Sequence, residues 1–144
     1  MTEAMPRIDF YLLDSDGEEA RLDTACRLVE KAWKQGLRSY LRADTTAEAQ
    51  ALDTRLWTFR KLSFVPHRLQ QSGRDAPVLI GTTAVTDDTH PLLVNLGRAL
   101  PEDFERYQRI VEIVDPDTER REASRVRYKI YRDRGYTPGT IKLK

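Results

Sequence analysis

The stretch RIDFYLLDSDGEEARLDTACRLVEKAWKQGLRSYL, residues 7–41, decides the fold. Its first seven residues are rich in β formers and lead into turn residues at 14–17, which predicts a strand. An amphipathic helix follows over about 18–35, Gly36 ends it, and residues 37–41 form a short second strand. A strand, a helix and a strand in this order indicate a parallel sheet with helices packed on its faces.

The rest of the chain continues this alternation. Residues 45–48, T-T-A-E, are a capping box, and an apolar face follows it, which predicts a second helix. Three apolar runs predict further strands, and a short helix near residues 102–107 separates the last two: 78–81, 91–95 and 109–114. We therefore expect one α/β domain over residues 1–144, with a mostly parallel sheet of about five strands flanked by helices.

Composition narrows the class of protein. A length of 144 residues suits one domain, and no apolar run approaches the roughly 20 residues that span a bilayer. The first residues have neither a basic nor an apolar region of the kind that a secretory signal needs, so we expect a cytoplasmic protein with no membrane partner. Cys26 is a single cysteine on the apolar face of the first helix, which predicts a buried, unreactive thiol.

The sequence from Asp115 to Tyr136 predicts a third helix. Asp115 before a proline supplies the cap, and Gly135 supplies the left-handed stop. On a 3.6-residue period one narrow apolar stripe would pack on the core, with Arg127 and Tyr131 flanking it: Ala123, Val126 and Ile130.

The opposite side of this helix is basic. Arginines and one tyrosine follow i, i+4, i+7, i+11 spacing, with Lys129 beside them: Arg121, Arg125, Tyr128 and Arg132. Residues 119–144 carry nine Lys and Arg against three Asp and Glu, whereas the rest of the chain carries 15 against 20. This side of the helix is either an ordinary solvated face or a binding surface for an anionic partner.

Residues 56–67, L-W-T-F-R-K-L-S-F-V-P-H, form a connection that is unusually aromatic. Its rings either fold back over the edge of the sheet or leave an apolar patch exposed for another protein. His67 has no nucleophile or second metal ligand near it in the sequence, which favours a hydrogen-bonded structural histidine.

The sequence offers little for catalysis. Nucleotide-binding α/β folds carry a glycine-rich phosphate loop after the first strand, whereas residues 14–19 here are D-S-D-G-E-E, whose carboxylates would repel phosphate. Gly81 ends a strand at a possible ligand-binding point, but one glycine favours a tight turn instead. Residues 87–90, D-D-T-H, are interpreted as a polar loop, so neither a cofactor nor a metal is expected.

Several segments together resemble one family: I-D-F-Y-L-L, L-W-T-F with S-F-V-P-H, P-V-L-I-G, P-L-L-V-N-L and R-Y-K-I-Y-R-D-R-G-Y. In their order and spacing they resemble the chi subunit of bacterial DNA polymerase III holoenzyme over nearly the whole chain. The resemblance implies a Rossmann-like fold and a non-catalytic accessory subunit. It also implies two partners, the psi subunit of the clamp-loader complex and the acidic C-terminal tail of single-stranded DNA-binding protein.

The resemblance also assigns residues. The binding-protein tail would lie on residues that largely coincide with the basic side of the third helix: Val114, Arg121, Arg125, Tyr128 and Lys129. The psi subunit would contact the aromatic connection: Trp57, Phe59, Phe64 and Pro66.

Two other functions remain open at this stage. The same basic side would serve a direct single-stranded nucleic-acid-binding module, with Tyr128 stacking on a base, although the acidic remainder offers no continuing groove for the backbone. A nucleotide-binding enzyme is the other alternative, and the acidic turn after the first strand counts against it.

Overall fold

The structure is a computed structural model that describes residues 6–14, 18–60, 64–83 and 89–143. Its strands are β1 (Arg7–Leu13), β2 (Ser39–Arg42), β3 (His67–Leu69), β4 (Val78–Gly81), β5 (Leu92–Asn95), β6 (Arg109–Val114) and β7 (Gly139–Leu143). Its helices are α1 (Glu18–Lys34), α2 (Thr46–Thr58) and α3 (Thr118–Asp133), with short 3₁₀ helices η1 (Gln70–Ser72) and η2 (Phe104–Arg106). Most of the acidic turn at 14–17 and residues 87–88 of the polar loop lie outside the described residues.

The seven strands form one sheet in the order β3-β4-β2-β5-β6-β1-β7, and every pair is parallel. The predicted α/β class and parallel sheet are confirmed, but the expected number of five strands is wrong. The two missed strands, β3 and β7, are the edges of the sheet, and neither contains a fully buried residue. Neither carries the continuous apolar run by which a buried parallel strand is recognised.

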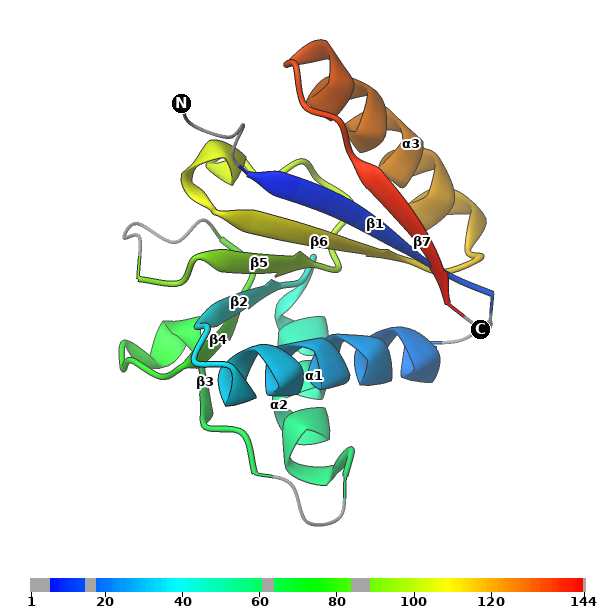
Figure 1. The fold of residues 1–144 in the computed structure, drawn as a ribbon. Helices are drawn as coiled ribbons and strands as arrows, with labels where there is room; N and C mark the ends of the chain where they lie inside the picture. Colours follow the sequence, from blue (N-terminus) through cyan, green and yellow to red (C-terminus); the bar gives the residue numbers. More distant parts are fainter. Residues whose placement is uncertain (1–5, 15–17, 61–63, 84–88, 144) are drawn as a thin grey trace.

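Two apolar clusters cover the two faces of the sheet. Helices α1 and α2 pack into the first cluster, and α3 with η2 packs into the second. Figure 1 shows α3 beside β1 and β7, away from α1 and α2. Cys26 lies fully buried in the first cluster, where burial and, to a lesser degree, the charge of Asp23 raise the pKa of its thiol to about 12. The thiol is therefore unreactive, as the sequence predicted.

The helix ends follow from local chemistry. Thr45 Oγ1 accepts a hydrogen bond of 3.1 Å from the Glu48 backbone N–H, which confirms the cap of α2.

The expected cap of α3 is wrong, because Asp117 caps this helix by accepting from the Arg120 backbone N–H at 2.9 Å. Asp115 is instead buried and accepts two side-chain hydrogen bonds from Arg120, at 2.9 and 2.7 Å. Gly135 has a φ of 97°, the left-handed stop that was expected.

The predicted core stripe of α3 is also wrong. Val126 is 60% exposed and Ala123 and Ile130 are only half-buried, whereas Ser124, Arg127 and Tyr131 face the sheet. The helix thus turns its polar residues toward the sheet. Arg127 and Tyr131, which were expected to flank the core-facing stripe, are themselves buried.

Glu112 on β6 explains this rotation. Its carboxylate is fully buried on the face that α3 covers, where it accepts hydrogen bonds from Arg127 Nε (3.1 Å), the Tyr131 hydroxyl (2.7 Å) and Asn95 Nδ2 (3.0 Å). A buried carboxylate without such partners is costly, so α3 must present its polar side to the sheet. Apolar periodicity could not reveal this, because the partner lies on another element.

The described part of the chain contains no helix that is both long and apolar enough to cross a membrane.

Arg127→Ala tests the role of this ion pair. The change leaves the Glu112 carboxylate buried without a cation, so we expect the free energy of unfolding to fall by about 3–5 kcal/mol in urea denaturation. Arg132→Ala removes an exposed arginine from the same helix and is the matched control, with a change within about 0.5 kcal/mol. Similar small losses in both variants would contradict the assignment.

Candidate functional site

The rotation of α3 places a row of cations in solvent. Arg121, Arg125 and Lys129 are exposed, and Tyr128 between them is half-buried. The Tyr128 ring packs against Phe10 of β1 with ring centroids 5.3 Å apart and a tilt of 56°. The tyrosine of this row therefore packs on the core, while the charged side chains project into solvent.

These cations are weakly compensated. Arg125 donates a hydrogen bond of 2.9 Å to Glu122, but the two side chains are 68% and 67% exposed, and such pairs contribute little to stability. Within the described residues, Arg121 and Lys129 have no carboxylate at ion-pair distance. An incoming carboxylate would consequently meet available positive charge.

Beneath the row lies apolar surface. Val114 is only 2% exposed and belongs to the same cluster as Tyr128, so this predicted site residue can back a pocket but offers little area itself. Leu12 of β1 is the register partner of Val114 and is only partly buried in that cluster. Sequence reasoning missed Leu12, because only the strand pairing brings it next to residue 114.

The aromatic connection forms a second surface on the other face of the sheet. Trp57 and Phe64 are 56% and 54% exposed, and their rings lie 5.3 Å apart. Phe59 and Pro66 are half-buried, and Phe59 packs against the first core cluster. The structure thus leaves this apolar patch uncovered by the described residues, whereas residues 61–63 lie outside them.

His67 lies next to that patch. Its Nδ1 lies 2.6 Å from the Val65 carbonyl oxygen, and its Nε2 lies 3.2 Å from the Asp53 carbonyl oxygen. Its ring also contacts Trp57 with centroids 4.9 Å apart. These contacts confirm a structural histidine.

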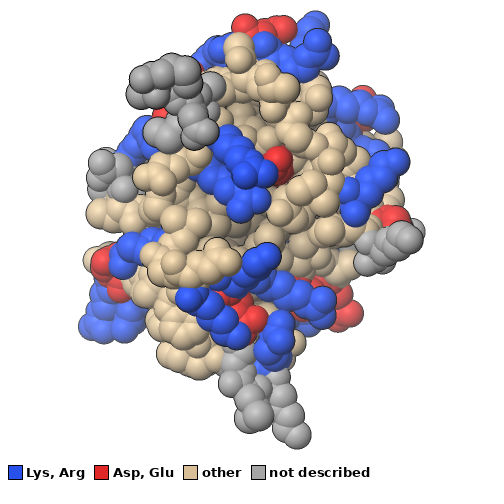
Figure 2. All heavy atoms as spheres, in the orientation of Figure 1, with Lys and Arg blue, Asp and Glu red and all other residues tan. Residues whose placement is uncertain are grey.

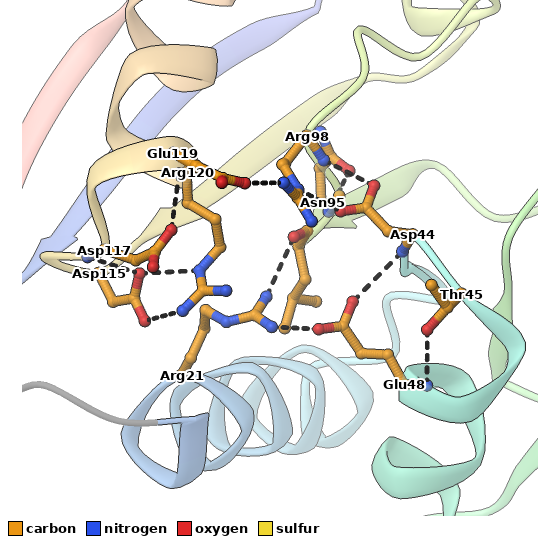
Figure 3. Close-up of polar contacts among 12 residues, drawn as sticks. Arg21, Asp44, Thr45, Glu48, Asn95, Arg98, Asp115, Asp117, Glu119 and Arg120 are labelled. Carbon is orange, nitrogen blue, oxygen red and sulfur yellow. Dashed lines mark hydrogen bonds and ion pairs between the residues drawn. The ribbon is translucent and has the colours of Figure 1, made fainter.

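The carboxyl edge of the sheet, where open α/β folds commonly bind ligands, is crossed by ion pairs (Figure 3). Arg21 donates to the Leu96 carbonyl at 3.0 Å and pairs with Glu48, while Arg98 pairs with Asp44 and Glu119. A hollow of about 400 Å³ lies among them. Each of these arginines already has a carboxylate partner, so the hollow presents no spare positive charge to a phosphate.

Asp115 and Arg120 extend this network. Burial by itself raises the pKa of the Asp115 carboxyl, but the hydrogen bonds and charge of Arg120 outweigh it, so this pKa lies below its usual value. Among the described residues, no group of three or more metal-ligating side chains comes together.

Positive charge alone does not identify a site. Figure 2 shows Lys and Arg side chains spread over the face turned to the viewer, with carboxylates between them. Arg27 and Lys31 of α1 are exposed as well. What distinguishes α3 is the half-buried tyrosine and the apolar cluster beside its cations.

Comparisons with known proteins agree with one another. The family model described as DNA polymerase III chi subunit, HolC, matches residues 5–139. "DNA polymerase III subunit chi" of Pseudomonas aeruginosa is 39% identical over 132 residues, 92% of this chain and 93% of the relative. The Escherichia coli protein of the same name is 29% identical over 147 residues, 97% of this chain and 100% of the relative. The C-terminal domain of the DEAD-box protein Dbp5 shares the fold alone, with a TM-score of 0.60, 16% identity, and coverage of 94% of this chain and 90% of that one.

Proposed function

The chain belongs to the DNA polymerase III chi subunit family and is therefore an accessory subunit of replication, and we propose that it links the clamp loader to single-stranded DNA-binding protein. In this role it acts in the cytoplasm and holds the acidic C-terminal tail of the binding protein on α3. It contacts DNA only indirectly and has no catalytic activity of its own.

The arrangement around Tyr128 carries this proposal. Arg121, Arg125 and Lys129 surround a ring that is fixed on Phe10. A guanidinium binds a carboxylate with two parallel hydrogen bonds, and an apolar end residue of a peptide packs against a fixed ring. A single such contact gives an affinity near micromolar, about −8 kcal/mol, which many tails on one coated template would strengthen.

Direct binding of single-stranded DNA is the main alternative. It needs an aromatic face on which a base can stack, whereas part of the Tyr128 ring is covered by Phe10. This favours a peptide, for which a ring edge and nearby charge suffice.

We further propose that the psi subunit covers the Trp57 patch. Two exposed aromatic rings in contact are typical of an anchor in a protein interface, where aromatic residues contribute most of the affinity. We assign the half-buried Phe59 and Pro66 to the same interface.

A protein with this role should not bind nucleotides. The arginines at the carboxyl edge are paired with carboxylates, so we expect calorimetry to show no saturable binding of ATP or NAD. A dissociation constant in the micromolar range would contradict the non-catalytic proposal.

Arg125→Ala tests the tail site. Loss of this guanidinium removes a charge-assisted contact, so we expect the affinity for an acidic, phenylalanine-terminated peptide to fall by about 1.5–3 kcal/mol in fluorescence anisotropy. Glu122→Gln removes the carboxylate that pairs with Arg125 and that would repel the acidic peptide. We therefore expect this variant to bind the peptide more tightly than wild type.

Arg27→Ala is the matched control, because this exposed arginine lies on the other face of the sheet and should leave the affinity unchanged. Melting temperatures of all variants should stay near wild type. Equal affinities of wild type and Arg125→Ala would show that the basic row is only a solvated face. Tighter binding of single-stranded DNA than of the peptide would favour the alternative function.

Trp57→Ala tests the second surface. Because the side chain is more than half exposed, we expect normal folding but a loss of about 2 kcal/mol or more in affinity for a psi subunit, measured by calorimetry. Affinity for the tail peptide should not change. Unaltered psi binding would place that partner elsewhere.

A further inference from the structure

The register of the sheet adds a residue to the tail site. Leu12 of β1 pairs with Val114 of β6 on one side and with Lys142 of β7 on the other. Register partners in neighbouring parallel strands point to the same face of the sheet. Val114 and Leu12 belong to the cluster that α3 covers, so Lys142 projects from that face too. The three residues form a row near the carboxyl end of the sheet.

The basic side of α3 is turned toward this row. On the opposite flank of the helix, Glu119 pairs with Arg98, which follows β5. Tyr128 lies on the other flank and contacts Phe10 of β1, the strand next to β7. Arg121 and Arg125 share the flank of Tyr128 by helical spacing. Figure 1 shows β7 running alongside α3.

The amino-terminal half of α3 is the half nearest Lys142. The helix starts four residues after β6 ends at Val114, and Arg121 lies in its first turns. Lys142 lies near the end of β7, level with Leu12 and Val114. It is exposed, and among the described residues it has no carboxylate at ion-pair distance.

We propose that the tail site extends across the surface from α3 to the edge strand β7, where Lys142 is a binding residue on the strand side. Arg121 and Arg125 hold carboxylates of the acidic peptide from the helix side, and Lys142 holds them from the strand side. Leu12, which is partly buried between Val114 and Lys142 in the register, supports the apolar end residue of the peptide. This inference rests on the proposed function and concerns the same partner, the acidic C-terminal tail.

The test is anisotropy of the same labelled, acidic, phenylalanine-terminated peptide with charge variants at Lys142. Lys142→Glu should weaken binding by roughly tenfold or more, and Lys142→Gln by roughly three- to tenfold. Lys142→Arg should retain wild-type affinity, since it keeps the charge. Lys31→Glu is the matched control, because this exposed lysine on α1 lies on the other face and should change binding less than about twofold.

The outcomes separate this inference from the proposed function. If Arg125→Ala weakens binding while Lys142→Glu stays within about twofold of wild type, the site is one-sided and the role of Lys142 is refuted. If the wild-type protein does not bind the peptide, both the proposed function and the role of Lys142 are refuted. Thermal melts accompany each titration, and Lys142→Gln, which introduces no new charge, decides the matter if Lys142→Glu is unstable.

Discussion

One buried carboxylate determines what α3 shows to solvent. Glu112 has no access to water and accepts hydrogen bonds from Asn95, Arg127 and Tyr131. Removing the cation from a buried ion pair lowers the free energy of unfolding by more than the loss of a typical apolar contact does. The helix is therefore held in the rotation that turns Arg127 and Tyr131 toward the sheet. The same rotation leaves Val126 in water and turns the row from Arg121 to Lys129 outward.

The resulting molecule has two surfaces on opposite faces of one sheet. The exposed cations and the tyrosine on α3 suit an acidic peptide, whereas Trp57 in the last turn of α2 and Phe64 in the following connection form an aromatic patch. The two surfaces share no residue, which is what the proposed role of connecting two different partners requires. At the carboxyl edge, where related folds bind ligands, Arg21, Arg98 and Arg120 are instead paired with carboxylates.

Sequence patterns predicted what depends on neighbours along the chain. The capping box at Thr45, the stop at Gly135 and the buried strands 78–81 and 109–114 rest on local chemistry, and the structure confirms them. Glu112 determines which side of α3 faces the core, and it lies on a different element, β6. Apolar periodicity within the helix therefore predicted the wrong core-facing stripe. Edge strand β7 has an exposed, mixed composition, so the contribution of Lys142 to the α3 surface became visible only through its register with Leu12.

The central claim is that the buried ion pair of α3 presents a peptide site on the flank that faces β7. The most direct measurement is a titration of ¹⁵N-labelled protein with the acidic, phenylalanine-terminated peptide, followed by amide chemical shifts. We expect the largest shifts in residues 121–129 and around Leu12 and Lys142, with little change near Trp57. Shifts concentrated at Trp57 and Phe64, or spread evenly over exposed cations such as Arg27, would contradict the claim.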